Sequence, residues 1–184
     1  MYVKRIKEKI YLIYSKEENE NVTGRPVQFA IILEKIKEGD MVDDTWHNGV
    51  LLFCVDGAIF PKRILTAPLG CEIAPLKENL ENTAVNDRIF HMKKREAFGY
   101  IYNISYPEDW DEDTDFQYEI PPETFSEDNC DVFAVSDGDQ VRILAAKCPR
   151  SKDTMRPIFK NAIIKETFIS VQELKEIAQA LEID

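Results

Sequence analysis

Short apolar runs separated by turn residues recur along the chain, and runs of this length and composition predict β-strands. These runs span residues 27–33, 50–55, 58–60, 131–135 and 140–146. Asp56-Gly57 separates the second run from the third, and Asp137-Gly138 lies between the last two. An Asp-Gly pair between two apolar runs is typical of a tight hairpin. The pattern therefore predicts two antiparallel hairpins, with Pro61 ending the first because proline has no N–H to donate to a ladder.

Further elements are predicted on either side of the second hairpin. Residues 98–106 are rich in aromatic and β-branched residues and are expected to form a strand that ends at Pro107. Residues 162–169 are expected to form the last strand. A short helix is predicted over 74–80, because Pro75 is near a helix start and Leu76 and Leu80 have i,i+4 spacing.

The C-terminal segment carries the clearest helix signal. Ser170 and Glu173 form a capping box, in which each residue satisfies a backbone N–H at the helix start. Four apolar residues then share one face of the predicted helix: Leu174, Ile177, Ala178 and Leu181. We expect an α+β fold, an antiparallel sheet built from hairpins with a few helices, on which this amphipathic helix packs.

The chain has 184 residues, of which 44% are hydrophobic, and this is enough to bury the core of a single domain over residues 1–184. No run approaches the ~18 consecutive apolar residues of a membrane span. Charged residues interrupt the N-terminal segment where a secretory signal needs an apolar region. We therefore expect a cytoplasmic protein that has no membrane partner.

The net charge of −11 comes from one part of the chain. Residues 96–141 contain 14 of the 34 acidic residues and no Lys or Arg, whereas the remaining 20 acidic and 23 basic residues give a balance of +3. An acidic field repels phosphate backbones, so direct nucleic-acid binding is disfavoured. A basic partner is the natural counterpart.

Motifs for catalysis and cofactor binding are few. The histidines, His47 and His91, have no metal-ligand spacing, the four cysteines form no C-x-x-C pair and are expected to be free thiols, and phosphate-binding glycine motifs are missing. We expect no cofactor, no structural metal and no enzymatic activity. The competing hypothesis is a small hydrolase that uses His47, His91 or the Asp43/Asp44 pair. A pocket holding two convergent polar groups with shifted pKa values would favour that alternative.

The acidic stretch that follows residue 106 is the strongest candidate for a binding surface. Its aromatic residues are interleaved with carboxylates, as at a protein-binding hot spot where charges set orientation around desolvated rings. The predicted partner-binding residues are Glu108, Asp109, Trp110, Asp111, Glu112, Asp113, Asp115, Phe116 and Tyr118. The other interpretations are a solvated acidic loop and weak calcium binding. A designed calcium loop is disfavoured because Thr114 stands where the sharp turn needs glycine.

The segment 43–61, with the preceding strand over 27–33, resembles the immunity protein 42 family. These proteins are antidotes encoded beside bacterial polymorphic and contact-dependent growth-inhibition toxins. The similarity rests on a sheet scaffold with Trp46, Gly49, Gly57 and Pro61. It extends over residues 24–184 and leaves 1–23 as an N-terminal extension.

The resemblance implies that the chain binds and neutralises the C-terminal toxin domain of its own system in the cytoplasm. A basic nuclease toxin fits the local acidity, since carboxylates can occupy the places of phosphates. Replacing Asp111, Glu112 and Asp113 by Lys is then expected to weaken binding, most strongly at low salt. The remaining alternative is an acidic adaptor or scaffold protein that has no toxin partner.

Overall fold

The computed structural model describes residues 2–6, 9–13, 22–36, 48–108, 114–154, 156–159 and 162–181. The strands are β1 (Tyr2–Ile6), β2 (Lys9–Ile13), β3 (Val22–Gly24), β4 (Phe29–Lys35), β5 (Asn48–Val55), β6 (Ala58–Phe60), β7 (Ala67–Pro68), β8 (Cys130–Ser136), β9 (Gln140–Lys147) and β10 (Lys165–Ser170). The helices are α1 (Leu69–Glu81), α2 (Asp87–Phe90), α3 (Lys94–Ser105), the 3-10 helix η1 (Glu123–Asp128) and α4 (Val171–Gln179).

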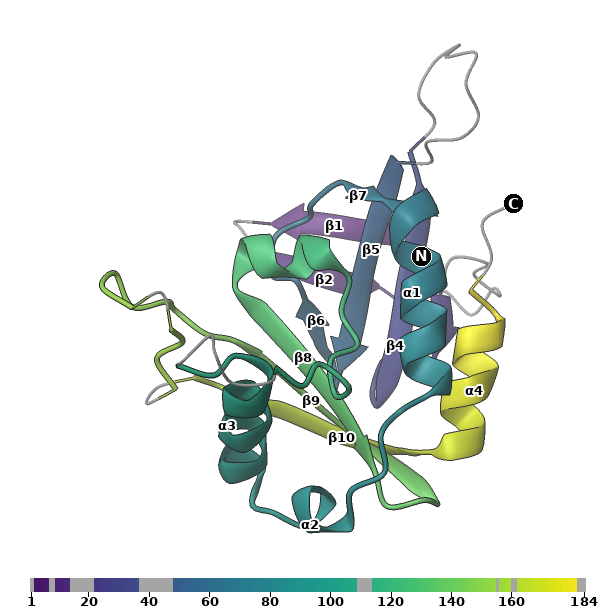
Figure 1. Cartoon of the computed structure of the whole chain (residues 1–184). Helices are drawn as coiled ribbons and strands as arrows, with labels where there is room; N and C mark the ends of the chain where they lie inside the picture. The colour runs from purple at the N-terminus through teal and green to yellow at the C-terminus, as the bar shows by residue number, and fades with distance from the viewer. Residues whose placement is uncertain are drawn as a thin grey trace.

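The strands form antiparallel sheets, which confirms the predicted α+β class. A five-stranded sheet has the order β3-β4-β5-β6, with β7 beside β5, and a three-stranded sheet has the order β10-β9-β8. β1 and β2 pair separately as a hairpin. Figure 1 shows α1 and α4 side by side along the five-stranded sheet, while α3 lies beside the β8-β9-β10 sheet.

Both predicted Asp-Gly hairpins are confirmed. Asp56 and Gly57 have φ values of 48° and 69° between β5 and β6, and positive φ at both central residues defines the turn that matches the twist of paired strands. The second turn joins β8 to β9, with Gly138 at φ 107°. Strands were also expected at 27–33 and 162–169, and β4 and β10 occupy these regions with shifted ends.

Gly49 is required by packing, not by an unusual φ. A Cβ atom on Gly49 would lie 2.5 Å from the Glu34 carbonyl oxygen and would overlap the Leu69 side chain at the start of α1. This close approach lets the first turn of α1 lie directly against β5.

The strand predicted over 98–106 is wrong, because this segment is the helix α3. Its buried residues recur at helical spacing and comprise Ala97, Phe98, Ile101, Tyr102 and Ser105. A strand would have buried alternate residues. The burial of this face against β8 and β9 outweighs the β propensity of the individual aromatic and β-branched residues.

The helix predicted over 74–80 is longer than expected. α1 begins at Leu69, so Pro75 lies inside it and not at its start. Pro75 is on the exposed side, while Leu69, Ile73, Leu76 and Leu80 face the core. Burial of the apolar face therefore keeps α1 helical at Pro75, although proline removes one backbone hydrogen bond.

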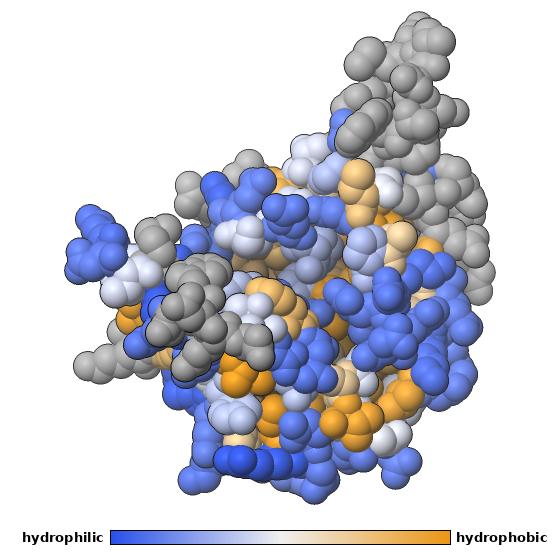
Figure 2. All heavy atoms as spheres, viewed as in Figure 1, coloured by the Kyte–Doolittle hydropathy of each residue, from blue (hydrophilic) through white to orange (hydrophobic). Residues whose placement is uncertain are grey.

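The C-terminal helix α4 forms where it was predicted, but it ends at Gln179, so the buried Leu181 lies beyond it. The Ser170 Oγ accepts a hydrogen bond from the Glu173 backbone N–H at 3.1 Å, which is the predicted cap. Leu174, Ile177 and Ala178 are buried along one face. Figure 2 shows hydrophilic side chains over most of the outer surface where α1 and α4 lie, as expected for helices that are apolar on one face only.

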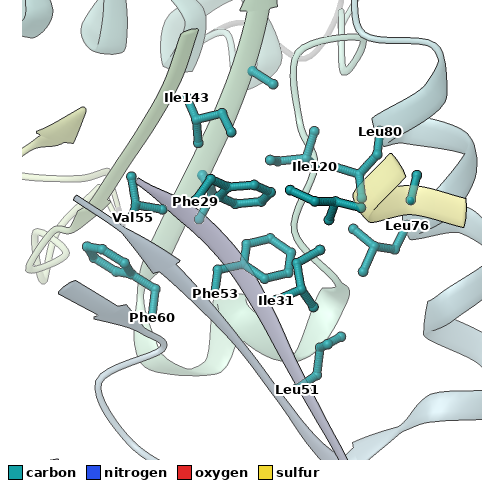
Figure 3. Close-up of a cluster of buried hydrophobic side chains, with 14 of the residues drawn as sticks. Phe29, Ile31, Leu51, Phe53, Val55, Phe60, Leu76, Leu80, Ile120 and Ile143 are labelled. Carbon is teal, nitrogen blue, oxygen red and sulfur yellow. The ribbon is translucent and has the colours of Figure 1, made fainter. Parts of the chain in front are cut away.

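The main core lies between the two sheets and the helices α1 and α4. Figure 3 shows Phe29 and Phe53 at its centre, with Leu76 and Leu80 of α1 and Ile143 of β9 around them. A second core lies on the opposite face of β8 and β9, beneath α3. β8 and β9 are thus buried on both faces, which explains the continuous apolar run of β8.

Candidate functional site

The predicted acidic and aromatic surface is only partly within the described residues, because 109–113 lie outside them. Glu108 is exposed, with its Oε1 3.8 Å from the Arg156 Nε. Beyond the gap, the Asp115 backbone N–H donates to the Ile104 carbonyl at 3.0 Å, and the Ser105 Oγ donates to the Asp115 carbonyl at 2.9 Å. The C-terminal end of α3 therefore fixes the backbone at Asp115, where the segment becomes described again.

The aromatic residues Phe116 and Tyr118 have different positions. Phe116 is 49% exposed and contacts the Tyr106 ring, with ring centroids 5.8 Å apart. Tyr118 is buried, and its hydroxyl accepts a hydrogen bond from the Asn86 side chain at 3.1 Å. The Phe116 ring is therefore accessible to solvent, whereas Tyr118 is buried.

A hollow of about 650 Å³ lies beside this segment, and we call it the acidic pocket. It is formed by the C-terminal end of α3, the segment that leads into η1, the start of β8 and one residue after β9. Its charged and phenolic lining residues are Tyr102, Tyr106, Glu119, Glu123, Asp131 and Arg150. The Phe116–Tyr106 ring contact connects the acidic pocket to the predicted surface.

Arg150 donates hydrogen bonds to some, but not all, of the polar atoms that line the acidic pocket. Its Nη2 donates to the Asp131 Oδ1 at 2.8 Å, its Nη1 donates to the Tyr102 hydroxyl at 3.0 Å, and its Nε donates to the Asn129 Oδ1 at 3.3 Å. The second carboxylate oxygen, Asp131 Oδ2, is buried and has no hydrogen-bond partner among the described residues. Since Asp131 is only 7% exposed, this oxygen is largely shielded from solvent.

Glu119 adds a second carboxyl group to the same pocket. Burial raises the pKa of Glu119, and the nearby Asp131 charge adds to this, although the hydrogen bond from the Tyr106 hydroxyl and the charge of Arg150 oppose the rise. Burial also raises the pKa of Asp131 despite its ion pair with Arg150. The pKa of Tyr106 is raised by burial and by its hydrogen bond to Glu119. The two carboxylates thus share too little positive charge to be well stabilised when ionised.

This arrangement can bind a cation or exchange protons. A cation placed between Asp131 and Glu119 would stabilise both ionised forms, and carboxyl groups with raised pKa values are also suited to general acid–base chemistry. The pocket meets the criterion set for the enzyme alternative, but with residues other than the predicted His47, His91, Asp43 and Asp44.

The sequence analysis did not select the residues of the acidic pocket. Glu119 and Asp131 are within the acidic range 96–141, but they are 12 residues apart. Arg150 is a further 19 residues along the chain. The helical spacing of Phe98, Ile101 and Tyr102 was the available signal, because a helix there carries Tyr102 and Tyr106 to the start of β8.

A second hollow, of about 850 Å³, has the opposite chemistry. It is largely apolar, with Phe60, Ile158 and Ile163 in its wall, and it is bordered by Lys62 and Lys147 and also Lys165. Asn129 lines both hollows, so they adjoin. A basic border suits an anionic group and not a basic partner.

Other candidate residues do not form a site in the described parts of the chain. His91 is exposed and pairs with Asp87 at 3.1 Å on α2, while His47 and the Asp43/Asp44 pair lie outside the described residues. The four cysteines are free, as predicted, and burial raises the pKa of Cys54 to about 12. Within the described ranges, no cluster of three metal-ligating side chains occurs and no helix is long and apolar enough to cross a membrane.

Comparisons with known proteins identify a family and a fold. The family model described as Immunity protein 42 matches residues 22–183. The solved structure of CdiI from Burkholderia dolosa AUO158 is similar to this chain, with a TM-score of 0.66 and 18% sequence identity over 86% of this chain and 96% of that chain. A search of curated proteins gave no match. The structural similarity shows a shared fold, and the family match covers nearly all of the chain.

Proposed function

The chain belongs to the immunity protein 42 family, and we propose that it binds and neutralises the C-terminal toxin domain of its own system in the cytoplasm. The toxin domain is a basic nuclease, and the surface that binds it is acidic and aromatic. In the predicted site, Glu108, Asp115 and Phe116 are accessible, and the neighbouring acidic pocket belongs to the same surface.

The observation that carries this proposal is the segregation of charge. Residues 96–141 hold 14 carboxylates and no Lys or Arg, and this part of the chain supplies the predicted surface and most of the acidic pocket. A nuclease has a basic cleft for phosphates, so a concentrated acidic surface is complementary to it and accelerates the encounter. Occupation of that cleft excludes the nucleic acid.

Catalysis by the acidic pocket is the second candidate, because Glu119 and Asp131 have raised pKa values in one hollow. Membership of an immunity family favours binding over catalysis. Arg150 also holds Asp131 in place, which suits a fixed docking position.

The test is co-purification with the C-terminal domain of the protein encoded immediately upstream, followed by affinity measurements between about 50 and 500 mM salt. We expect a 1:1 complex that salt weakens. The triple variant D111K/E112K/D113K should lose affinity by on the order of 100-fold at low salt. The matched control E78K/E81K/E176K makes the same charge change at exposed residues outside 96–141.

Failure of the wild-type protein to form a complex would remove the toxin-binding proposal. An equal loss of affinity in both triple variants would keep toxin binding but would exclude the predicted surface as its location.

A further inference from the structure

We propose that the acidic pocket receives one arginine side chain of the toxin, whose guanidinium binds between Asp131 Oδ2 and Glu119. This inference rests on the proposed function and specifies its chemistry. It assigns a contact to residues that the sequence pattern did not select.

The first argument is the buried oxygen without a partner. Asp131 lines the pocket and is only 7% exposed, its Oδ1 accepts a hydrogen bond from Arg150, and its Oδ2 is buried with no donor among the described residues. Buried polar groups in proteins are almost always hydrogen-bonded. A donor from outside the chain completes this carboxylate.

The second argument is the balance of charge. Glu119, Glu123 and Asp131 face the same hollow, and the lining contains one cation, Arg150. Every other described lining residue is uncharged, so the lining has three carboxyl groups and one cation. A positively charged group is therefore the occupant that the lining favours.

The third argument concerns the kind of cation. The Tyr102 and Tyr106 rings lie 4.9 Å apart and form an aromatic wall, and the guanidinium groups of Arg150 and Arg156 already lie 5.5 and 5.7 Å from the Tyr102 ring centroid. A planar, weakly hydrated guanidinium stacks on aromatic rings and pairs with carboxylates through two N–H groups, whereas an ammonium does neither as well. The wall therefore favours arginine over lysine.

The size and accessibility of the pocket are compatible with this occupant. Its volume of about 650 Å³ lies within the ~300–1,000 Å³ range of ligand sites. The exposed Phe116 ring is linked to the wall through Tyr106, so a toxin that inserts an arginine would also contact Phe116. A buried arginine beside aromatic side chains is a common feature of interface hot spots.

The discriminating variant is Glu119→Gln, which keeps the side-chain shape and an acceptor for Tyr106 but removes the charge. We expect the toxin affinity to fall by on the order of 30-fold or more, the loss typical of a desolvated charge pair. The control Asp139→Asn removes the same charge from the exposed β8–β9 turn of the acidic stretch and should change affinity less than about threefold. Thermal unfolding of each variant verifies folding.

A second measurement identifies the toxin residue. Each arginine of the toxin domain is replaced by alanine and combined with Glu119→Gln in a double-mutant cycle. We expect one arginine whose loss weakens the wild-type complex but adds little to the Glu119→Gln variant. Replacement of that arginine by lysine should recover only a minor part of the affinity.

The outcomes separate the two proposals. If the wild-type chain forms no complex, the proposed function fails and the toxin is removed as the occupant. If a complex forms but Glu119→Gln behaves like Asp139→Asn, or no arginine couples to Glu119, the pocket inference is overturned while toxin binding stands.

Discussion

Asp128 and Asp131 are three residues apart, and both are buried, yet their surroundings differ. The Asp128 carboxylate accepts hydrogen bonds from the Lys62 and Arg63 backbone N–H groups at 2.6 and 3.2 Å and from the Arg63 Nε at 2.8 Å, and it pairs with the Lys147 ammonium. Among the described residues, Asp131 has one side-chain partner, Arg150, which binds one of its two oxygens.

The pKa values of the two carboxyl groups move in opposite directions. Burial raises the pKa of Asp128, but the hydrogen bonds from Lys147, the Lys62 backbone and Arg63 outweigh it, so the net pKa is lowered. At Asp131 burial outweighs Arg150, and the pKa is raised. A carboxylate that is fully paired within the chain stabilises the fold, whereas one that is half paired in a hollow keeps binding capacity for a partner.

The largest expected effect comes from breaking the Asp128 cluster. Asp128→Ala leaves two backbone donors and two cations without their acceptor and should lower the free energy of unfolding by about 3–5 kcal/mol. Urea unfolding at pH 7 measures it, with Asp139→Ala, at an exposed turn, expected to stay within about 0.5 kcal/mol. A loss below about 1 kcal/mol for Asp128→Ala would contradict the structural role.

Removal of Arg150 should have a somewhat smaller effect, about 2–4 kcal/mol for Arg150→Met, because it leaves Asp131 buried without a cation. The loss should be greater at pH 8 than at pH 5, since the ionised carboxylates are then uncompensated. Lys147→Met is the matched comparison. Asp128 keeps three other donors, so we expect about 1 kcal/mol or less. Equal losses in the free energy of unfolding for Arg150→Met and Lys147→Met would contradict the proposed difference between Asp128 and Asp131.

The smallest effect has the opposite sign. The pKa of Glu119 is raised in the folded protein, so its ionised form costs stability at pH 7 and the cost is relieved as the pH falls through that raised value. Glu119→Gln should therefore stabilise the protein by about 0.5–1 kcal/mol at pH 7. This gain should disappear below the ordinary Glu pKa of about 4.3.

Thermal unfolding over pH 4–8 measures this difference. The Asp128 contribution has the reverse dependence, because a lowered pKa gives stability that is present above the ordinary Asp value and is lost as the pH falls through the folded-state value. Destabilisation by Glu119→Gln at pH 7 would show that Glu119 is a structural group. A gain in stability together with weaker toxin binding is what we expect of a functional group.

Local sequence signals predicted much of the fold. The two Asp-Gly turns, the Ser170 cap and the apolar face of α4 each depend on residues close together in the chain, and each forms as predicted. The helix α3 was missed because aromatic and β-branched residues favour strands on average, whereas burial against β8 and β9 decided its structure.

The candidate site was predictable only in part. Charge counting located the acidic stretch, in which Glu108 and Phe116 are exposed and Asp115 is partly exposed, but the pattern did not distinguish Phe116 from the buried Tyr118. That distinction depends on Asn86, which approaches Tyr118 from a segment 32 residues away.

The sequence by itself determined the class of the fold, the place of the negative charge and the family resemblance, because these follow from local patterns and composition. Only the tertiary structure decided that Asp128 is fully paired and Asp131 is not. Their partners, Lys62, Lys147 and Arg150, come from distant segments, and whether a buried carboxylate is satisfied depends on which donors the packed elements bring within hydrogen-bonding distance.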